Sequence, residues 1–303
     1  CRSITYYLLQ YKRKLRFCKS LKVLKVVAGC ITFDPPSPRF PSLKVLNACL
    51  YQPNNESMEK LFSCCPVLED LSLRADIGDA VLNFKVSAPE LKTFRVDLFN
   101  AYKNAYEYPS DDEDEAPDCI DVYNFFINAP KLETLDIHTD ILSNFFFENS
   151  ESLVKANIDL THHDSSERPT FAKSATALMA AVSNVKDLSL SADCFKDFTC
   201  GEHTNDRRWS QPKKVPICLL SQLKTITLKG VRGAPEEMKM AKYLLMAGKV
   251  LETVTVSITT DRDLLSVYST EKGLQKTFCS FQKGSKTCVV KFVKGKVRRF
   301  LDY

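Results

Sequence analysis

Apolar and polar positions follow one short pattern that returns along the chain, apolar-x-x-apolar-x-apolar. Clear copies are Leu43–Ala48 and Leu68–Leu73. The second half of each copy alternates apolar and polar residues, which is the period of a β-strand with one buried face. The pattern therefore predicts nine strands, in copies that begin at Leu21, Leu43, Leu68, Leu91, Leu132, Leu153, Val185, Leu223 and Leu251.

The spacing of these copies indicates how the strands are arranged. Successive copies begin 22, 25, 23, 41, 21, 32, 38 and 28 residues apart. The short spacings match leucine-rich repeats of about 20–29 residues, and the long ones require insertions. A single short strand cannot bury its apolar side, whereas stacked copies share one core. The sequence thus predicts an α/β fold, a leucine-rich-repeat solenoid with a curved parallel sheet and helices on its convex side.

Segments between the copies are expected to return the chain across the convex side. Residues 55–64 carry Met58, Leu61 and Phe62 at helical spacing, which predicts a helix. Four copies have a proline two residues before the first leucine. Proline should end the preceding helix there and let the strand begin cleanly. These prolines are Pro41, Pro66, Pro89 and Pro130.

Polar residues between and after the apolar positions should face the concave surface, where a solenoid holds its partner. They are mixed in charge, which favours a protein or peptide over nucleic acid or a phosphorylated small molecule. The candidate binding residues are Asp70, Ser72, Arg74, Thr93, Arg95, Asp97, Thr134, Asp136, His138, Lys155, Asn157 and Asp159.

The C-terminal part of the chain changes character and predicts a cap for the solenoid. Residues 235–247 should form an amphipathic helix with two acids in its first turn. A further helix is expected over 264–281, and a closing strand over 287–293. The predicted organisation is an N-terminal segment 1–17 (a remnant or a cap), irregular repeats 18–214, a C-terminal domain 215–293 and a basic tail 294–303.

Charge and composition exclude several classes of function. The net charge of +5 is scattered, so neither a nucleic-acid nor a membrane surface is expected, and the basic C-terminus is interpreted as a solvated tail. The acidic run 111–115 is interpreted as a surface loop. No apolar run approaches the roughly 18 residues that span a bilayer.

Neither catalysis nor metal binding is predicted, and no cofactor is expected. The adjacent His162 and His163 have no further ligands at suitable spacing. The twelve cysteines do not form a secreted disulfide framework, and Cys49, Cys64 and Cys218 occupy apolar positions. With no secretory signal pattern at its start, the chain is predicted to be intracellular, nuclear or cytoplasmic.

Three stretches of the repeats and the C-terminal block resemble plant F-box proteins that combine leucine-rich repeats with an FBD domain. The repeat stretches are Phe40–Leu46, Leu61–Leu71 and Ala88–Lys92. The C-terminal block is similar to FBD in segments 215–220, 242–245 and 281–288, with Gly230, Glu236 and Glu237 between them. The resemblance covers residues 18–293, and it carries over no catalytic residue.

What the resemblance implies is a substrate-recognition module of a cullin–RING ubiquitin ligase. In this family an N-terminal F-box docks a Skp-family adaptor, and the repeats hold a protein substrate. Residues 1–17 are too short for an F-box, so the adaptor and cullin are expected as partners only where one is encoded upstream. The alternatives are a small-molecule receptor for a hormone or an inositol phosphate, or a scaffold with no ligase contact.

Overall fold

The fold consists mainly of parallel strands with few helices, which confirms the predicted α/β class. The computed structural model describes residues 3–8, 19–28, 40–53, 55–77, 83–99, 123–140, 143–160, 178, 182–191, 194, 215–259 and 270–294. The chain divides into two compact units. Unit 1 comprises residues 1–153 and 161–181, and unit 2 comprises residues 154–160 and 182–303.

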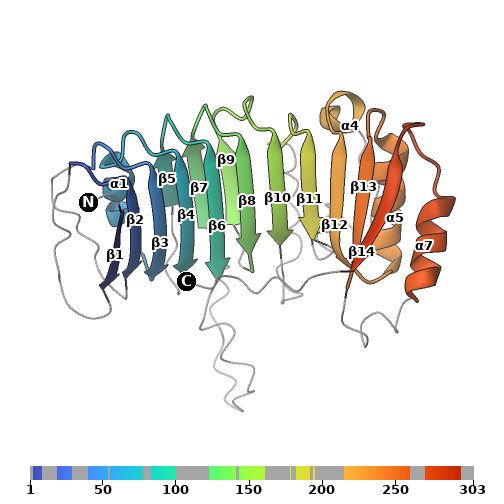
Figure 1. Cartoon of the computed structure of the whole chain (residues 1–303), viewed down its shortest axis with the longest axis horizontal. Helices are drawn as coiled ribbons and strands as arrows, with labels where there is room; N and C mark the ends of the chain where they lie inside the picture. Colours follow the sequence, from blue (N-terminus) through green and yellow to red (C-terminus); the bar gives the residue numbers. More distant parts are fainter. Residues whose placement is uncertain are drawn as a thin grey trace, which may run out of the picture. The chain divides into compact units, whose positions relative to one another are not determined.

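The strands of the main sheet of unit 1 from β2 onward are the predicted repeats, whereas β1 lies in the segment 1–17, where no copy was predicted. Its strands lie side by side, parallel and without a register shift (Figure 1). They are β1 (Ser3–Leu8), β2 (Val23–Ala28), β3 (Val45–Tyr51), β4 (Asp70–Asp76), β6 (Thr93–Phe99) and β8 (Thr134–Thr139). From β2 onward each strand begins at the third residue of its copy. The apolar residues of the copies are buried, for example Leu43, Leu71 and Phe94, each 0% exposed.

One backbone arrangement fixes this register at every step in unit 1. The carbonyl at the second position of a copy accepts hydrogen bonds from two consecutive N–H groups of the next copy. The Lys44 carbonyl accepts from Glu69 and Asp70, both at 2.9 Å, and the Lys92 carbonyl accepts from Glu133 and Thr134 at 2.9 and 3.0 Å. This forked bond satisfies donors just before each strand starts, which holds neighbouring copies in step.

The four prolines share a role in turns that was not predicted. Each occupies the second position of a tight turn, and in each turn the N–H of the first leucine donates to the residue just before the proline. Leu43 donates to the Phe40 carbonyl at 3.2 Å, and Leu91 donates to the Ala88 carbonyl at 3.1 Å. Because proline has a fixed φ, it suits this turn position. The turns at Pro89 and Pro130 follow strands, so the prediction that these prolines end a helix is wrong there.

A second sheet takes the place of the helices expected in three return segments of unit 1. The return over α1 (Asn55–Ser63) is a helix, as predicted for 55–64. The next returns form a three-stranded parallel sheet of β5 (Asn83–Ser87), β7 (Tyr123–Asn128) and β9 (Ser143–Phe147) (Figure 1). Their apolar residues alternate with a period of two, which favours a strand. The buried rings of Phe84, Phe125 and Phe145 stack on the inner side, with centroids 4.7 and 4.9 Å apart.

Unit 2 contains parallel strands and, among its described residues, three helices. Its strands are β10 (Lys155–Leu160), β11 (Asp187–Ser191), β12 (Thr225–Val231), β13 (Thr253–Ile258) and β14 (Val289–Lys294). Its helices are α4 (Ile217–Ser221), α5 (Pro235–Ala247) and α7 (Glu271–Ser280). The predicted helix 235–247 and the closing strand are confirmed, and the described part of the predicted helix 264–281 is α7. Gly230, with φ of 68°, lies at the irregularity between β12 and β13.

The expectations for the cysteines and for membrane-spanning segments can be compared with the described residues. Cys49 and Cys218 are buried as expected, whereas Cys64 is only half-buried and its neighbour Cys65 takes the buried position. No helix in the described ranges is long and apolar enough to cross a membrane.

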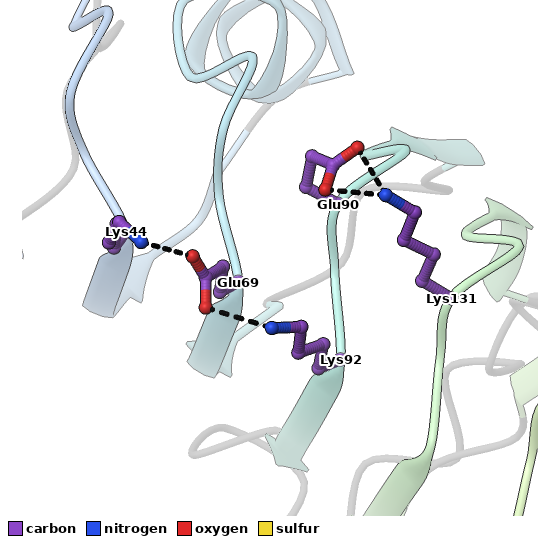
Figure 2. A network of polar contacts seen from close by, with 5 residues as sticks. All are labelled: Lys44, Glu69, Glu90, Lys92 and Lys131. Carbon is purple, nitrogen blue, oxygen red and sulfur yellow. Dashed lines mark hydrogen bonds and ion pairs between the residues drawn. The ribbon is translucent and has the colours of Figure 1, made fainter.

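A ladder of alternating charge lies at the start of the unit 1 strands. Glu69 forms ion pairs with Lys44 of the preceding copy and with Lys92 of the following copy, the latter at 3.2 Å (Figure 2). Glu90 accepts bonds from Lys131 at 2.7 Å. These side chains are largely exposed, so they contribute little stability and mainly favour one order of neighbouring copies.

Replacing Glu69 with glutamine should reduce the free energy of unfolding only at a pH at which Glu69 is ionised. Hydrogen bonds from Lys44 and Lys92 lower the pKa of Glu69 below its ordinary value of 4.5. Because the folded-state pKa is lowered, the contribution is complete above that ordinary value and is lost as the pH falls through the folded-state pKa. Urea denaturation should show a small loss in Glu69→Gln at neutral pH, which disappears in acid and shrinks in molar salt. A loss that does not depend on pH or salt would contradict this explanation.

Candidate protein-binding face

The nine candidate residues of unit 1 form a regular grid on one face of its main sheet. Register places them in three rows across β4, β6 and β8. We call this set the polar grid; its rows are Asp70–Thr93–Thr134, Ser72–Arg95–Asp136 and Arg74–Asp97–His138. The apolar residues between them point to the opposite, buried side. Alternation along each strand thus brings side chains from three copies onto one surface.

Lateral ion pairs connect the strands of the grid. The Arg95 guanidinium lies 2.8 Å from Asp70 Oδ1 on the neighbouring strand and 3.4 Å from the Ser72 hydroxyl. The Arg95 and Asp70 side chains are 48% and 30% exposed. At such exposure an ion pair adds little stability, so the pair mainly fixes the orientation of two charges on this face.

The third row is more enclosed. Arg74 Nε lies 3.4 Å from Asp97 Oδ2, and His138 Nε2 lies 4.0 Å from Asp97 Oδ1. The Arg74 guanidinium also lies over the ring of Phe99, 5.0 Å from its centroid. Only 14% of the Asp97 side chain is exposed. The row therefore presents a partly buried carboxylate between two nitrogen-bearing side chains.

Burial has the largest effect on the pKa of the Asp97 carboxyl. It raises the pKa of this carboxyl, and His138 and Arg74 only partly oppose it, while Asp140 and Asp136 add to the rise. Because the pKa is raised, ionised Asp97 costs the folded state stability at neutral pH, and the cost is removed as the pH falls through the folded-state pKa.

The variant Asp97→Asn should therefore be as stable as the parent at neutral pH, or more stable. Asparagine keeps the shape and an acceptor for Arg74 but carries no charge to desolvate. Urea denaturation at neutral pH and below the folded-state pKa of Asp97 measures this, and the difference between the two proteins should narrow in acid. A marked destabilisation at neutral pH would show instead that the ion pairs of Asp97 outweigh its burial.

Three residues at the C-terminal end of this face were not predicted. Tyr51, Asp76 and Phe99 lie in register beyond the third row, because β3, β4 and β6 each continue past the repeat pattern. Tyr51 is 37% exposed, and Asp76 is only 6% exposed. The signal was present in the sequence, since the period of two continues through these positions.

The remaining candidates belong to unit 2. Lys155, Asn157 and Asp159 lie on β10, where Asn157 is buried and the other two reach solvent. The Lys229 ammonium of β12 donates to the Asn157 amide oxygen, across a β11 that carries only serine at the intervening positions. This arrangement belongs to unit 2.

Three cations that could serve a small anionic ligand are already engaged. Arg95 is paired with Asp70, Arg74 lies against Asp97, and Lys229 donates to an amide. No group of three or more His, Cys, Asp or Glu side chains that could hold a metal occurs in the described part of the chain. His162, His163 and the acidic run 111–115 lie outside the described residues.

Two family models of known proteins match parts of the chain. The model of the FBD family matches residues 211–256, and the model described as the leucine-rich repeats of FBD-associated F-box protein At5g56370 matches residues 5–104. The chain is thus similar to plant proteins that combine leucine-rich repeats with an FBD domain. This confirms the family resemblance carried by the repeat stretches and the C-terminal block. No solved structure matches the chain.

Relatives in Arabidopsis thaliana share this organisation in their names. The FBD-associated F-box protein At5g60610 is 27% identical over 81% of this chain and 70% of its own length. The F-box/FBD/LRR-repeat protein At5g56420 is 26% identical over 91% of this chain and 69% of its own length. A second F-box/FBD/LRR-repeat protein, At5g62970, is 28% identical over 81% of this chain and 60% of its own length. The chain thus spans between about three fifths and seven tenths of these relatives.

Proposed function

We propose that this chain is a protein-binding module, the substrate-recognition part of an F-box-type receptor for a cullin–RING ubiquitin ligase. The polar grid carries the proposal. Its nine side chains come from three copies in exact register and combine both signs of charge. Mixed charges on a rigid sheet suit a protein surface of complementary pattern.

Asp97 supports a role for the grid beyond stability. Its burial raises its pKa, so the fold would gain by losing this charge. Charged groups that cost stability are typical of positions kept for binding. On this proposal Asp97→Asn would retain stability and weaken substrate binding.

The proposed architecture is a curved solenoid of repeats over 18–214, closed by the FBD-like domain over 215–293. The families that match the two ends of this range support it, with leucine-rich repeats over 5–104 and FBD over 211–256. In this arrangement the grid would lie on the concave side, with a protein substrate against it.

The proposed ligase contact comes from the family, whose members are named F-box proteins. An F-box encoded before Cys1 would bind the Skp-family adaptor and, through it, the cullin. Reading the transcript upstream of Cys1 and testing that product for adaptor binding checks this part alone. A full-length product that does not bind the adaptor would remove the ligase contact from the proposal and leave the grid untouched.

A charge-swap variant tests substrate binding by the grid. Arg95→Glu combined with Asp70→Lys keeps a lateral ion pair but reverses the pattern that a partner meets. The matched control, Lys131→Glu with Glu90→Lys, swaps a pair in the ladder of Figure 2. In affinity purification from plant extract, partners should be lost with the first variant and kept with the second. Equal recovery with both variants would contradict the proposal.

A further inference from the structure

The outer face of the sheet β5-β7-β9 exposes two stacked phenylalanines. Phe126 and Phe146 are in register on β7 and β9, with ring centroids 5.1 Å apart and planes 15° from parallel. They are 41% and 46% exposed, whereas the inner stack through Phe125 is buried. Large aromatic side chains paired on a solvent face mark an interaction surface more often than scattered ones do.

On this face, the polar side chains at the strand starts bond to one another, whereas the next row carries an exposed lysine beside the two rings. At the strand starts, Asn124 donates to Asn83 at 2.8 Å and Asn144 donates to Asn124 at 3.0 Å, so these amides satisfy one another. In the next row Lys85 is in register with Phe126. The Lys85 side chain is exposed and forms no ion pair or hydrogen bond in the described part of the chain.

Among the described residues, the row therefore presents a positive charge with no ion-pair partner beside two exposed rings. Neighbouring strands are about 4.8 Å apart, so the row from β5 to β9 spans about 10 Å, the length of three extended residues. The exposed acid Glu148 directly follows β9, at the other side of this sheet. The charge on the β5 side favours a carboxylate there, and the rings favour apolar side chains beside it.

We propose that the row Lys85–Phe126–Phe146 is a second protein-binding surface, which takes an apolar segment of a partner with a carboxylate at its β5 end. It lies on a different sheet from the polar grid and does not depend on the function proposed for it. The rings supply apolar contact, and Lys85 selects acidic over basic segments and fixes their direction.

Two labelled peptides test the proposal on the purified chain by fluorescence anisotropy. One carries glutamate followed by two phenylalanines at alternate positions, and the other has lysine in place of that glutamate. The acidic peptide should bind at least about tenfold more tightly, and Lys85→Glu should reverse the preference. Phe126→Ser with Phe146→Ser should weaken both by at least about tenfold. The control Lys276→Glu, an exposed charge on α7, should change neither.

Several results would overturn the proposal. Equal binding of the two peptides would show that Lys85 does not select for charge. Unchanged binding by the double serine variant would show that the two rings do not contact the peptide. Self-association that the serine variant abolishes, without peptide preference, would assign the surface to a second copy of the chain. Binding to phosphatidylcholine vesicles with the same dependence on the rings would assign it to lipid. Circular dichroism verifies that each variant is folded.

Discussion

Replacing Phe125 with alanine should destabilise unit 1 by about 3–5 kcal/mol. Phe125 is 0% exposed and lies between Phe84 and Phe145 in the inner stack of the second sheet. Truncation leaves a cavity and removes two ring contacts, each worth about 0.5–1.5 kcal/mol. Urea denaturation gives the free energy of unfolding, and hydrogen exchange in β7 and β9 places the loss in unit 1.

The neighbouring residue provides a matched control. Phe126→Ala removes the same atoms one position along the strand, on the exposed side. It should cost no more than about 1.5 kcal/mol, mainly the contact with Phe146. Similar losses for the two variants would contradict the assignment of Phe125 to the core and of Phe126 to the surface.

The second large effect is expected at the start of α5. The Glu237 side chain is 2% exposed and accepts from the N–H groups of Arg232, Gly233 and Ala234 at 2.8, 2.8 and 3.2 Å. It also pairs with Arg232 Nε at 3.0 Å. One carboxylate thus satisfies the turn before the helix together with a largely buried guanidinium.

The variant Glu237→Ala should destabilise unit 2 by about 3–5 kcal/mol, because it removes the buried carboxylate that pairs with Arg232 and accepts from the turn donors. Glu237→Gln keeps the shape and one acceptor and should lose less. Glu236→Ala is the control, since this neighbour makes only a 3.4 Å contact with Lys239 and should cost about 0.5 kcal/mol or less. Hydrogen exchange in α5 reports the result, and equal effects at positions 236 and 237 would refute the capping role.

Sequence reasoning predicted what depends on periodicity and register. The buried positions of the copies follow from alternation, and so does the placement of Ser72, Arg95 and Asp136 on one face of the sheet. The helix 235–247 was predicted from its apolar stripe and acidic first turn. Local patterns and stacking of equivalent copies were sufficient for these features.

Features that depend on contacts between distant segments were missed. The sheet β5-β7-β9 lies in the irregular insertions, where no repeat pattern guided the interpretation, although Phe84 and Val86 alternate as strand residues do. Glu237 was interpreted as a favourable charge near a helix dipole, whereas it is buried because Gly233 and Arg232 turn back toward it. The pairing of Arg95 with Asp70 depends on side-chain conformation, which spacing does not determine.

The most direct test of the central claim is a site-specific cross-link from the polar grid. A photoreactive residue placed at Ser72, in the middle row, should cross-link to a substrate protein in plant extract. The Arg95→Glu and Asp70→Lys swap should abolish this product. The same residue at the exposed Gln282 of unit 2 serves as the comparison. Cross-linking at Gln282 but not at Ser72, or at Ser72 regardless of the swap, would contradict the grid as the substrate-binding surface.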